Sequence, residues 1–428
     1  MFSVSKMTRI RRRSLRQAAQ TFRSASAVAV LVGVASGLGM AQTAGSPDTS
    51  FGTGGMVTTT LGASLTTLTA IEQSNGDIAA IAGFNNEGAA NPNEEVVGLI
   101  RYTSSGTLIG VTTAAWSANG INKPTAVAVQ SNGDIVVVGT AQAFIDAAQE
   151  FGIARFKPNG QLDATFGDGG LVTTTPSGPF PMPSAVIVQP NGQILVGGFV
   201  NGSGVHKPGQ TVLVRYNPNG SLDTTFGMGG IVEVQAGVAS PAALAQLSDG
   251  SYLALGGAGA VVEFSSTGVL QSAVTPGTVV AAIKSGSGAL LFQPNGDFVM
   301  AQDVHTGCVN CHDSAAQVSR FSETGVVDPT FSSTPFTFAG NDQTKPQAIA
   351  LQSNGQIVAG GLANANGTPV MGGLARLDSN GTLDTTFASG GSLLSGQVVS
   401  GLLIQTDGKI VAVGEIDGDL AVARYLAN

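Results

Sequence analysis

The chain has 428 residues, of which 60 are glycine and 18 are proline, and only 11% are charged and 6% aromatic. With 43% apolar residues and so few charges the chain is not disordered, and a composition rich in Gly, Ser, Thr and Val excludes a coiled coil. The formal net charge is −8. This composition predicts an all-β protein with many tight turns.

Residues 1–42 have the pattern of a secretory signal peptide. They contain seven basic residues and no acidic ones, and the apolar run 25–40 ends beside the small residues Ala41 and Ala44, where cleavage is expected. The run is shorter than the ~20 residues that span a bilayer and is diluted by glycines, so we expect removal and not anchoring. The predicted location is the periplasm, the cell surface or the extracellular space. The basic residues are Lys6, Arg9, Arg11, Arg12, Arg13, Arg16 and Arg23.

Removal of this segment would make the chain strongly acidic. It would take seven of the 19 basic residues and leave 12 against 27 acidic ones, a formal charge of −15. Such a chain repels phosphate groups, so we expect no nucleic acid as a partner and no membrane insertion after removal. We expect a monomer that binds a protein or another surface ligand.

One short phrase recurs through the rest of the chain, residues 45–428. It contains Asn-Gly or Asp-Gly between apolar runs such as 125–129 and 135–138, which predicts β-hairpins, and we expect type I′ turns with positive φ at both central residues. The turn glycines lie 57, 59, 58, 46, 59 and 53 residues apart, a spacing close to the length of a propeller blade. They are Gly76, Gly133, Gly192, Gly250, Gly296, Gly355 and Gly408.

A second phrase follows the first in most repeats. Its copy at residues 155–170 predicts a third strand, another Asn-Gly turn and a fourth strand at 171–174. The fourth repeat departs from it, with Glu263 where arginine usually stands and no Phe-Gly element, which predicts a distorted blade. We interpret the repeated arginines as packing features with a buried stem and a hydrogen-bonded head. They are Arg101, Arg155, Arg215, Arg320, Arg376 and Arg424.

The two ends of the repeat region carry complementary halves of one repeat. Residues 47–55 hold the second half, whereas the last repeat stops after Arg424 and Tyr425. Pairing of these halves would close a ring and remove the exposed sheet edges, while an open solenoid would need capping units that the sequence lacks. We therefore predict an all-β, single-domain, seven-bladed β-propeller, closed by pairing of the N-terminal strand with the last blade.

The Leu-Asp-Thr-Thr-Phe-Gly-x-Gly-Gly element, cleanest at residues 222–230, resembles the delta-60 repeat family. This family is a β-propeller domain of unknown function in exported bacterial proteins, and the resemblance covers essentially everything after the first 42 residues. It implies the fold and export but supplies no general catalytic residues. The chain has only three histidines and neither a Gly-x-Ser-x-Gly nor a His-Glu-x-x-His motif, so we expect no catalytic site.

The connections between second and third strands vary greatly in length. Variable loops on a rigid scaffold are the usual place for binding, although such insertions are also tolerated without a function. The sequence thus predicts an exported, non-catalytic scaffold that binds through loops on one face. These connections are residues 85–95, 141–150, 201–210, 303–315 and 363–370.

The fifth repeat's connection holds the chain's only two cysteines and two of its three histidines. Cys308-x-x-Cys311-His312 is the attachment sequence of c-type haem, in which both thiols bond the vinyl groups and His312 ligates iron. This interpretation makes the protein an electron-transfer protein, the alternative to a scaffold. A disulfide between the cysteines, or zinc held by His305, Cys308, Cys311 and His312, accounts for the same residues. The sequence leaves all three interpretations open.

Overall fold

The chain divides into two compact units, Met1–Ala41 and Gln42–Asn428. The secondary structure of the described residues consists of strands, and none of these residues forms a helix that is long and apolar enough to cross a membrane. The predicted signal peptide lies outside the described residues. The computed structural model describes residues 43–62, 65–85, 94–118, 120–144, 147–201, 209–235, 241–256, 261–274, 289–293, 295–305, 314–323, 326–332, 334–340, 343–364 and 371–427.

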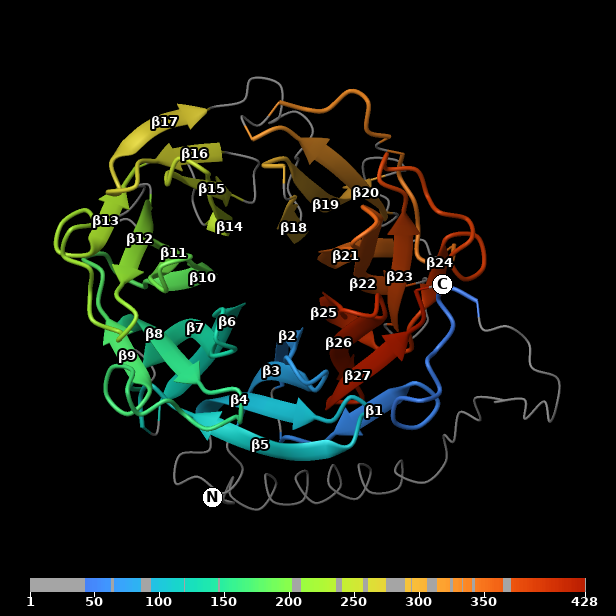
Figure 1. The fold of residues 1–428 in the computed structure, drawn as a ribbon, viewed down its shortest axis with the longest axis horizontal. Coiled ribbons are helices and arrows are strands. Elements are labelled where there is room, and N and C mark those ends of the chain that lie inside the picture. Colours follow the sequence, from blue (N-terminus) through green and yellow to red (C-terminus); the bar gives the residue numbers. More distant parts are fainter. Residues whose placement is uncertain are drawn as a thin grey trace, which may run out of the picture. The chain divides into compact units, whose positions relative to one another are not determined.

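The strands form antiparallel groups in which consecutive strands pair, and each group is a blade (Figure 1). The first four blades each have four described strands, numbered from the inside of the ring outward. Blade 1 contains β2 (Thr66–Glu72), β3 (Ile78–Asn85), β4 (Glu95–Tyr102) and β5 (Leu108–Ala114); blade 2 contains β6 (Ile121–Val129), β7 (Ile135–Gln142), β8 (Gln149–Phe156) and β9 (Leu171–Thr174). Blade 3 contains β10 (Met182–Val188), β11 (Ile194–Val200), β12 (Gln210–Tyr216) and β13 (Ile231–Val234); blade 4 contains β14 (Pro241–Gln246), β15 (Tyr252–Gly256), β16 (Val261–Phe264) and β17 (Leu270–Val274).

Among the remaining blades, blade 5 is less regular than the others. In blade 5 a single bridge between Ala316 and Phe336 stands in the place of a fourth strand, and one parallel bridge between Ser314 and Gln343 joins this blade to the next. Blade 5 contains β18 (Ala289–Phe292), β19 (Phe298–His305) and β20 (Ser314–Phe321); blade 6 contains β21 (Gln343–Leu351), β22 (Ile357–Asn364), β23 (Met371–Leu377) and β24 (Ser392–Leu394); blade 7 contains β25 (Val398–Ile404), β26 (Ile410–Ile416), β27 (Asp419–Tyr425) and β1 (Met56–Thr59).

The blades follow one another around a ring. The innermost strands contact each other in the order β2, β6, β10, β14, β18, β21 and β25, and β25 contacts β2 again (Figure 1). The buried apolar residues fall into seven clusters, and each cluster joins one blade to the next. The fold is therefore an all-β propeller, as predicted, and this arrangement is consistent with seven blades.

The second and third strands of each blade are buried because a neighbouring blade covers each of their faces. In β7, Val136 and Val138 pack toward blade 3, whereas Val137 packs toward blade 1. Alternate side chains of a strand point to opposite faces, so a strand covered on both faces is apolar throughout. This explains the continuous apolar runs after each turn.

The innermost strands carry a repeated β-bulge. In four blades the register shifts immediately after a proline, at Pro124, Pro183, Pro241 and Pro346. Proline has no N–H to donate to the ladder and is tolerated at bulges. The prolines thus lie where the pairing is already interrupted.

The last blade is completed by the N-terminal part of the described chain, as predicted. Strand β1 pairs with β27 in antiparallel register, from Met56 opposite Ala423 to Thr59 opposite Leu420. The backbone N–H of Asp48 donates to the carbonyl of Arg424 over 2.8 Å. The complementary half-repeats therefore join into one blade and close the ring.

The expected type I′ geometry of the Asn-Gly turns is wrong. Gly76 has φ +82°, but Asn75 does not have a positive φ, and the Gly76 N–H donates to the Gln73 carbonyl over 2.8 Å. The turn is a type I turn followed by a glycine in the left-handed region, a three-residue hairpin loop. The Asn75 side chain accepts a hydrogen bond from the Asp77 N–H over 3.1 Å and thereby stabilises the turn.

We expect Phe51→Ala to destabilise the ring by about 3–5 kcal/mol, because it removes a fully buried aromatic side chain from the closing blade. Denaturant unfolding measures this change in free energy. Phe144→Ala is the matched control, since Phe144 is 64% exposed, and should stay within about 0.5 kcal/mol of the parent. Equal effects of both substitutions would contradict the closing role of Phe51.

Candidate functional site

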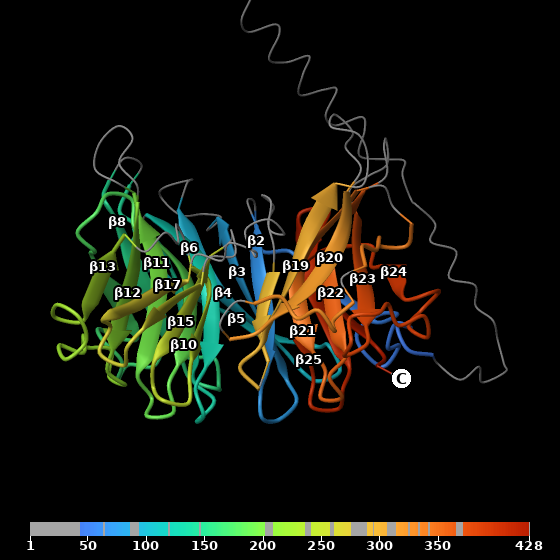
Figure 2. The same ribbon diagram turned by 90° about the horizontal axis from the view of Figure 1, so that it is seen from above.

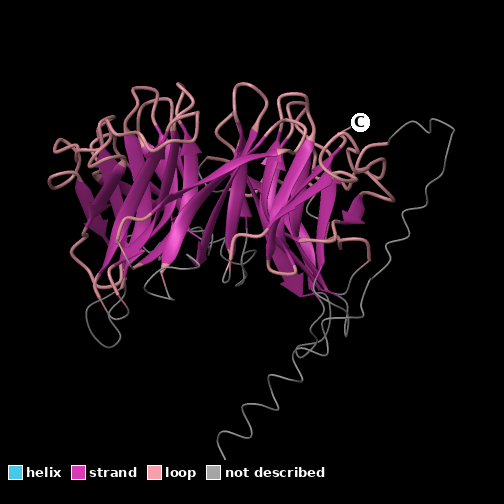
Figure 3. Ribbon diagram, turned by 90° about the horizontal axis from the view of Figure 1, so that it is seen from below, coloured by secondary structure: helices cyan, strands magenta, loops and turns pink. Residues whose placement is uncertain are grey.

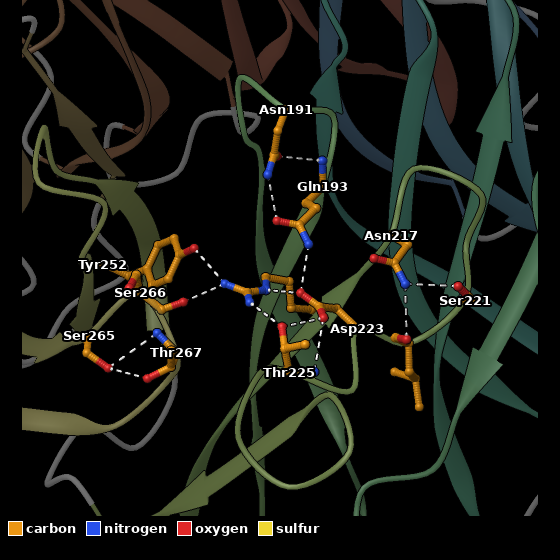
Figure 4. A network of polar contacts seen from close by, with 12 residues as sticks. Asn191, Gln193, Asn217, Ser221, Asp223, Thr225, Tyr252, Ser265, Ser266 and Thr267 are labelled. Carbon is orange, nitrogen blue, oxygen red and sulfur yellow. Dashed lines mark hydrogen bonds and ion pairs between the residues drawn. The ribbon is translucent and has the colours of Figure 1, made fainter.

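An arginine on the third strand of blade 3 lies at the centre of a large polar network. The Arg215 Nε donates to the Asp223 carboxylate over 2.8 Å, and its Nη1 donates to the Tyr252 hydroxyl over 3.0 Å and to the Ser266 carbonyl over 2.5 Å. Its guanidinium also lies 4.5 Å from the centre of the Phe226 ring. Figure 4 shows the labelled residues Asp223, Tyr252 and Ser266 around the guanidinium to which they are hydrogen-bonded.

Five of the repeated arginines share most of this arrangement. Each pairs with an aspartate through Nε at 2.7 to 2.9 Å and lies 4.4 to 5.0 Å from a phenylalanine ring centre. In the last blade Asp48 and Phe51 supply these partners for Arg424. This confirms the interpretation of these arginines as packing features. Four of them are no more than 7% exposed, namely Arg155, Arg215, Arg376 and Arg424.

Each arginine also links its blade to the next one. We call this contact the arginine clasp: a donor from the third strand of one blade to a backbone carbonyl that follows the third strand of the next blade. Hydrogen bonds of this kind from charged donors are stronger than neutral ones. The pairs are Arg101 with Asn159, Arg155 with Pro218, Arg215 with Ser266, Arg320 with Ser379, Arg376 with Ala427 and Arg424 with Ser104.

Hydrogen bonds within the blade lower the pKa of the aspartate that pairs with the arginine. Burial by itself raises the pKa of Asp163, but the hydrogen bonds from Thr165 and Arg155 outweigh burial and hold that pKa at about 2. A carboxyl whose pKa is lower in the folded chain than in the unfolded chain stabilises the fold at neutral pH. That stabilisation is complete above the unfolded pKa of about 4 and is lost as the pH falls toward 2.

We expect Asp163→Asn to lower the free energy of unfolding by about 1–3 kcal/mol at pH 7, because it weakens a charged hydrogen bond. The variant should also lose less stability than the parent as the pH falls from about 4 toward 2. Denaturant unfolding at a series of pH values measures both effects. Asp168→Asn, at an exposed position in the turn before β9, serves as the control. An unchanged pH dependence in Asp163→Asn would argue against the hydrogen bonds of the Asp163 carboxylate as the source.

The two edges of the ring differ in their connections. The turns between first and second strands, and the turns that follow the third strands, lie on one edge (Figures 2 and 3). The clasps end on carbonyls of the turns after the third strands, so they belong to the same edge. The second strands end and the third strands begin at the other edge, and connections of different length join them. Their lengths range from two residues between Ile416 and Asp419 to nine between Asn85 and Glu95.

In the sequence, the cysteine segment connects β19 to β20. Cys308, Cys311 and His312 lie outside the described residues, and of His305 only the backbone is described, paired with Ser314. The haem, zinc and disulfide interpretations therefore remain predictions. Within the described part of the chain, no three His, Cys, Asp or Glu side chains are grouped as metal ligands.

Polar side chains surround the base of this hairpin. Gln302 donates to Gln317 over 3.4 Å, and Ser314 donates to the Thr344 carbonyl over 3.4 Å. One Asp303 carboxylate oxygen is buried without a hydrogen-bond partner. A porphyrin needs apolar burial, and these described residues at the base of the hairpin do not offer it.

Sequence reasoning missed a hollow of about 540 Å³ on the outside of blade 3. It is lined by apolar residues of β13, by Glu233, which accepts a hydrogen bond from the Ser177 N–H over 2.6 Å, and by Met228. Met228 is 90% exposed, at the position held by Asp168 in blade 2. The departure of Met228 from the repeat pattern was the one signal for this site in the sequence.

This architecture defines the chain as a β-propeller built from one repeat. Four segments, residues 130–166, 189–226, 352–387 and 405–428, match the family described as "Domain of unknown function (DUF5122) beta-propeller". These four segments are thus similar to the repeats of this propeller family, and the resemblance drawn from the Leu-Asp-Thr-Thr-Phe-Gly element is confirmed. The chain matches no curated protein.

A solved structure has a similar fold. The WD40 repeats of RRP9 are similar over 90% of this chain and 99% of theirs, with 13% sequence identity and a TM-score of 0.50. YCF48 bound to a D1 peptide covers 87% of this chain and 97% of its own at 12% identity and TM-score 0.47, and U3-55K covers 86% and 98% at 12% and 0.48. At these identities the likeness concerns the fold alone.

Proposed function

We propose that the protein is an exported, non-catalytic scaffold that binds a protein or another surface ligand through the connections between second and third strands. One observation carries this proposal: the turns between first and second strands have five residues in every blade, whereas the connections between second and third strands vary from two to nine residues. The uniform turns take part in the contacts between blades. Variable connections on a rigid frame are the usual place for recognition. The predicted signal peptide at residues 1–42 and the acidic composition favour a ligand outside the cytoplasm that is not anionic.

The shortest connection offers a way to test this role. Ile416 and Asp419 pair across Asp417 and Gly418, which both have positive φ and form a two-residue hairpin turn. Val200 and Gln210 pair in the same way at the base of a nine-residue connection. Asp-Gly can therefore replace residues 201–209 without a change in strand register.

We expect this replacement to reduce binding of the purified protein to the envelope fraction of the producing cells by about tenfold or more, because it removes recognition surface. Co-sedimentation measures the binding, and thermal unfolding should stay within a few degrees of the parent. The control is Asn219→Ser in a turn of the clasp edge, which should bind as the parent does. Undiminished binding after replacement of this and the other long connections would contradict the proposal.

The Cys308-x-x-Cys311-His312 motif supports a second candidate function, electron transfer by one covalently attached haem c. The motif has the spacing that attachment requires, and export would supply a compartment in which attachment occurs. The polar residues at the base of the β19 and β20 hairpin weigh against it. Zinc or a disulfide at these residues is compatible with the scaffold role.

For haem attachment we expect a red protein from a host with haem-attachment machinery, with a haemochrome spectrum that survives denaturation. Cys308→Ser or Cys311→Ser should abolish the colour. A colourless protein from such a host would eliminate the electron-transfer function. Thiol titration and zinc analysis of that colourless protein then distinguish a disulfide from a metal site held by His305, Cys308, Cys311 and His312.

A further inference from the structure

The contact between blades 4 and 5, which we call the 4–5 joint, differs from the other joints of the ring. The six arginine clasps connect the six other pairs of neighbouring blades, one clasp to each pair. At the 4–5 joint Glu263 occupies the arginine's place: it lies opposite Leu253, as Arg215 lies opposite Leu195. A carboxylate cannot donate a hydrogen bond to a backbone carbonyl.

Two further donors of the repeat are also replaced at this joint. In blade 2 the side chain of Gln130 donates to the Gly192 carbonyl of blade 3, and the Gly167 N–H donates to the Asn219 carbonyl. Blade 4 has Leu247 in place of the glutamine, and its chain passes from Phe264 to β17 without a Phe-Gly element. The arginine, the glutamine and the glycine N–H, which are donors in blade 2, therefore have no counterpart in blade 4.

The joint between blades 1 and 2 provides an internal comparison. Blade 1 also lacks the Phe-Gly element, but Arg101 and Gln73 both donate to the second turn of blade 2, to the carbonyls of Asn159 and Pro158. Loss of the Phe-Gly element alone therefore leaves a clasped joint. The 4–5 joint combines that loss with the loss of the arginine and the glutamine.

Charge and packing both make the 4–5 joint weaker than the other joints. Glu263 and Glu323, which come from opposite sides of the joint, line one hollow of about 320 Å³ together with Asp249. Like charges that share one hollow repel each other. The apolar cluster of this joint has six buried described residues, whereas the clusters of the other joints have nine to thirteen.

We propose that the 4–5 joint is the seam at which the closed ring opens. Opening there breaks no arginine clasp, separates carboxylates that line one hollow and exposes the smallest apolar cluster among the described residues, so it requires less free energy than opening at any clasped joint. The opening leaves the β1 and β27 closure intact. It is a conformational property of the scaffold and does not depend on which ligand the loops bind.

Hydrogen–deuterium exchange of the folded full chain, read by mass spectrometry, tests the seam. The amides of β15, β16 and β19, which flank it, should exchange about tenfold or more faster than those of β7, β8 and β11 at the clasped joint between blades 2 and 3. Glu263→Arg supplies the missing donor opposite the Glu323 backbone and should slow exchange on both sides of the seam several-fold. Glu263→Gln removes the charge without restoring the arginine and should slow it less.

Two results would overturn the proposal. One is equal exchange at the two joints in the unmodified chain. The other is a Glu263→Arg variant that exchanges like the unmodified chain, or no more slowly than Glu263→Gln. Arg101→Gln provides a converse measurement that does not depend on the folding of Glu263 variants, and it should raise exchange in β3, β4 and β7 toward the values at the seam.

Discussion

The ring depends on one interaction, the guanidinium of a third-strand arginine that reaches the backbone of the next blade. Blades of a propeller pack face to face through apolar side chains, and such packing is not directional. The clasp adds direction: its aspartate and phenylalanine fix the guanidinium within its own blade, and the carbonyl it reaches fixes the turn of the neighbour. The register between blades is thus set by charged hydrogen bonds at one edge.

The two edges of the ring are therefore under different structural constraints. The clasp ends on a carbonyl of the turn that follows each third strand, so the form of this turn is constrained by the contact between blades. The opposite edge carries no such requirement, and its connections reach nine residues at the hairpin of Val200 and Gln210. Variation is concentrated where it does not disturb the contacts between blades.

Much of the fold could be predicted because the sequence repeats. The spacing of the turn glycines indicated the blades, and the split between residues 47–55 and Arg424 indicated the closure. The predicted turn type was wrong because Asn-Gly fits both a two-residue and a three-residue hairpin loop. The pairing of Gln73 with Asp77 decides between the two loops. The candidate site was less predictable, because the partners of Arg215 come from its own blade and from blade 4. The repeat in the sequence shows which residues form one blade. It does not show which residues of two neighbouring blades come into contact, and the polar network around Arg215 depends on those contacts.

The closing blade also constrains how the chain is made. Asp48 and Arg424 are 376 residues apart, and bringing such distant groups together costs about 5 kcal/mol of chain entropy. During synthesis, the strand at Met56–Thr59 has no partner until the residues around Leu420–Ala423 have emerged from the ribosome. The early blades can form in sequence, but the ring becomes a cooperative whole only when the last repeat is available.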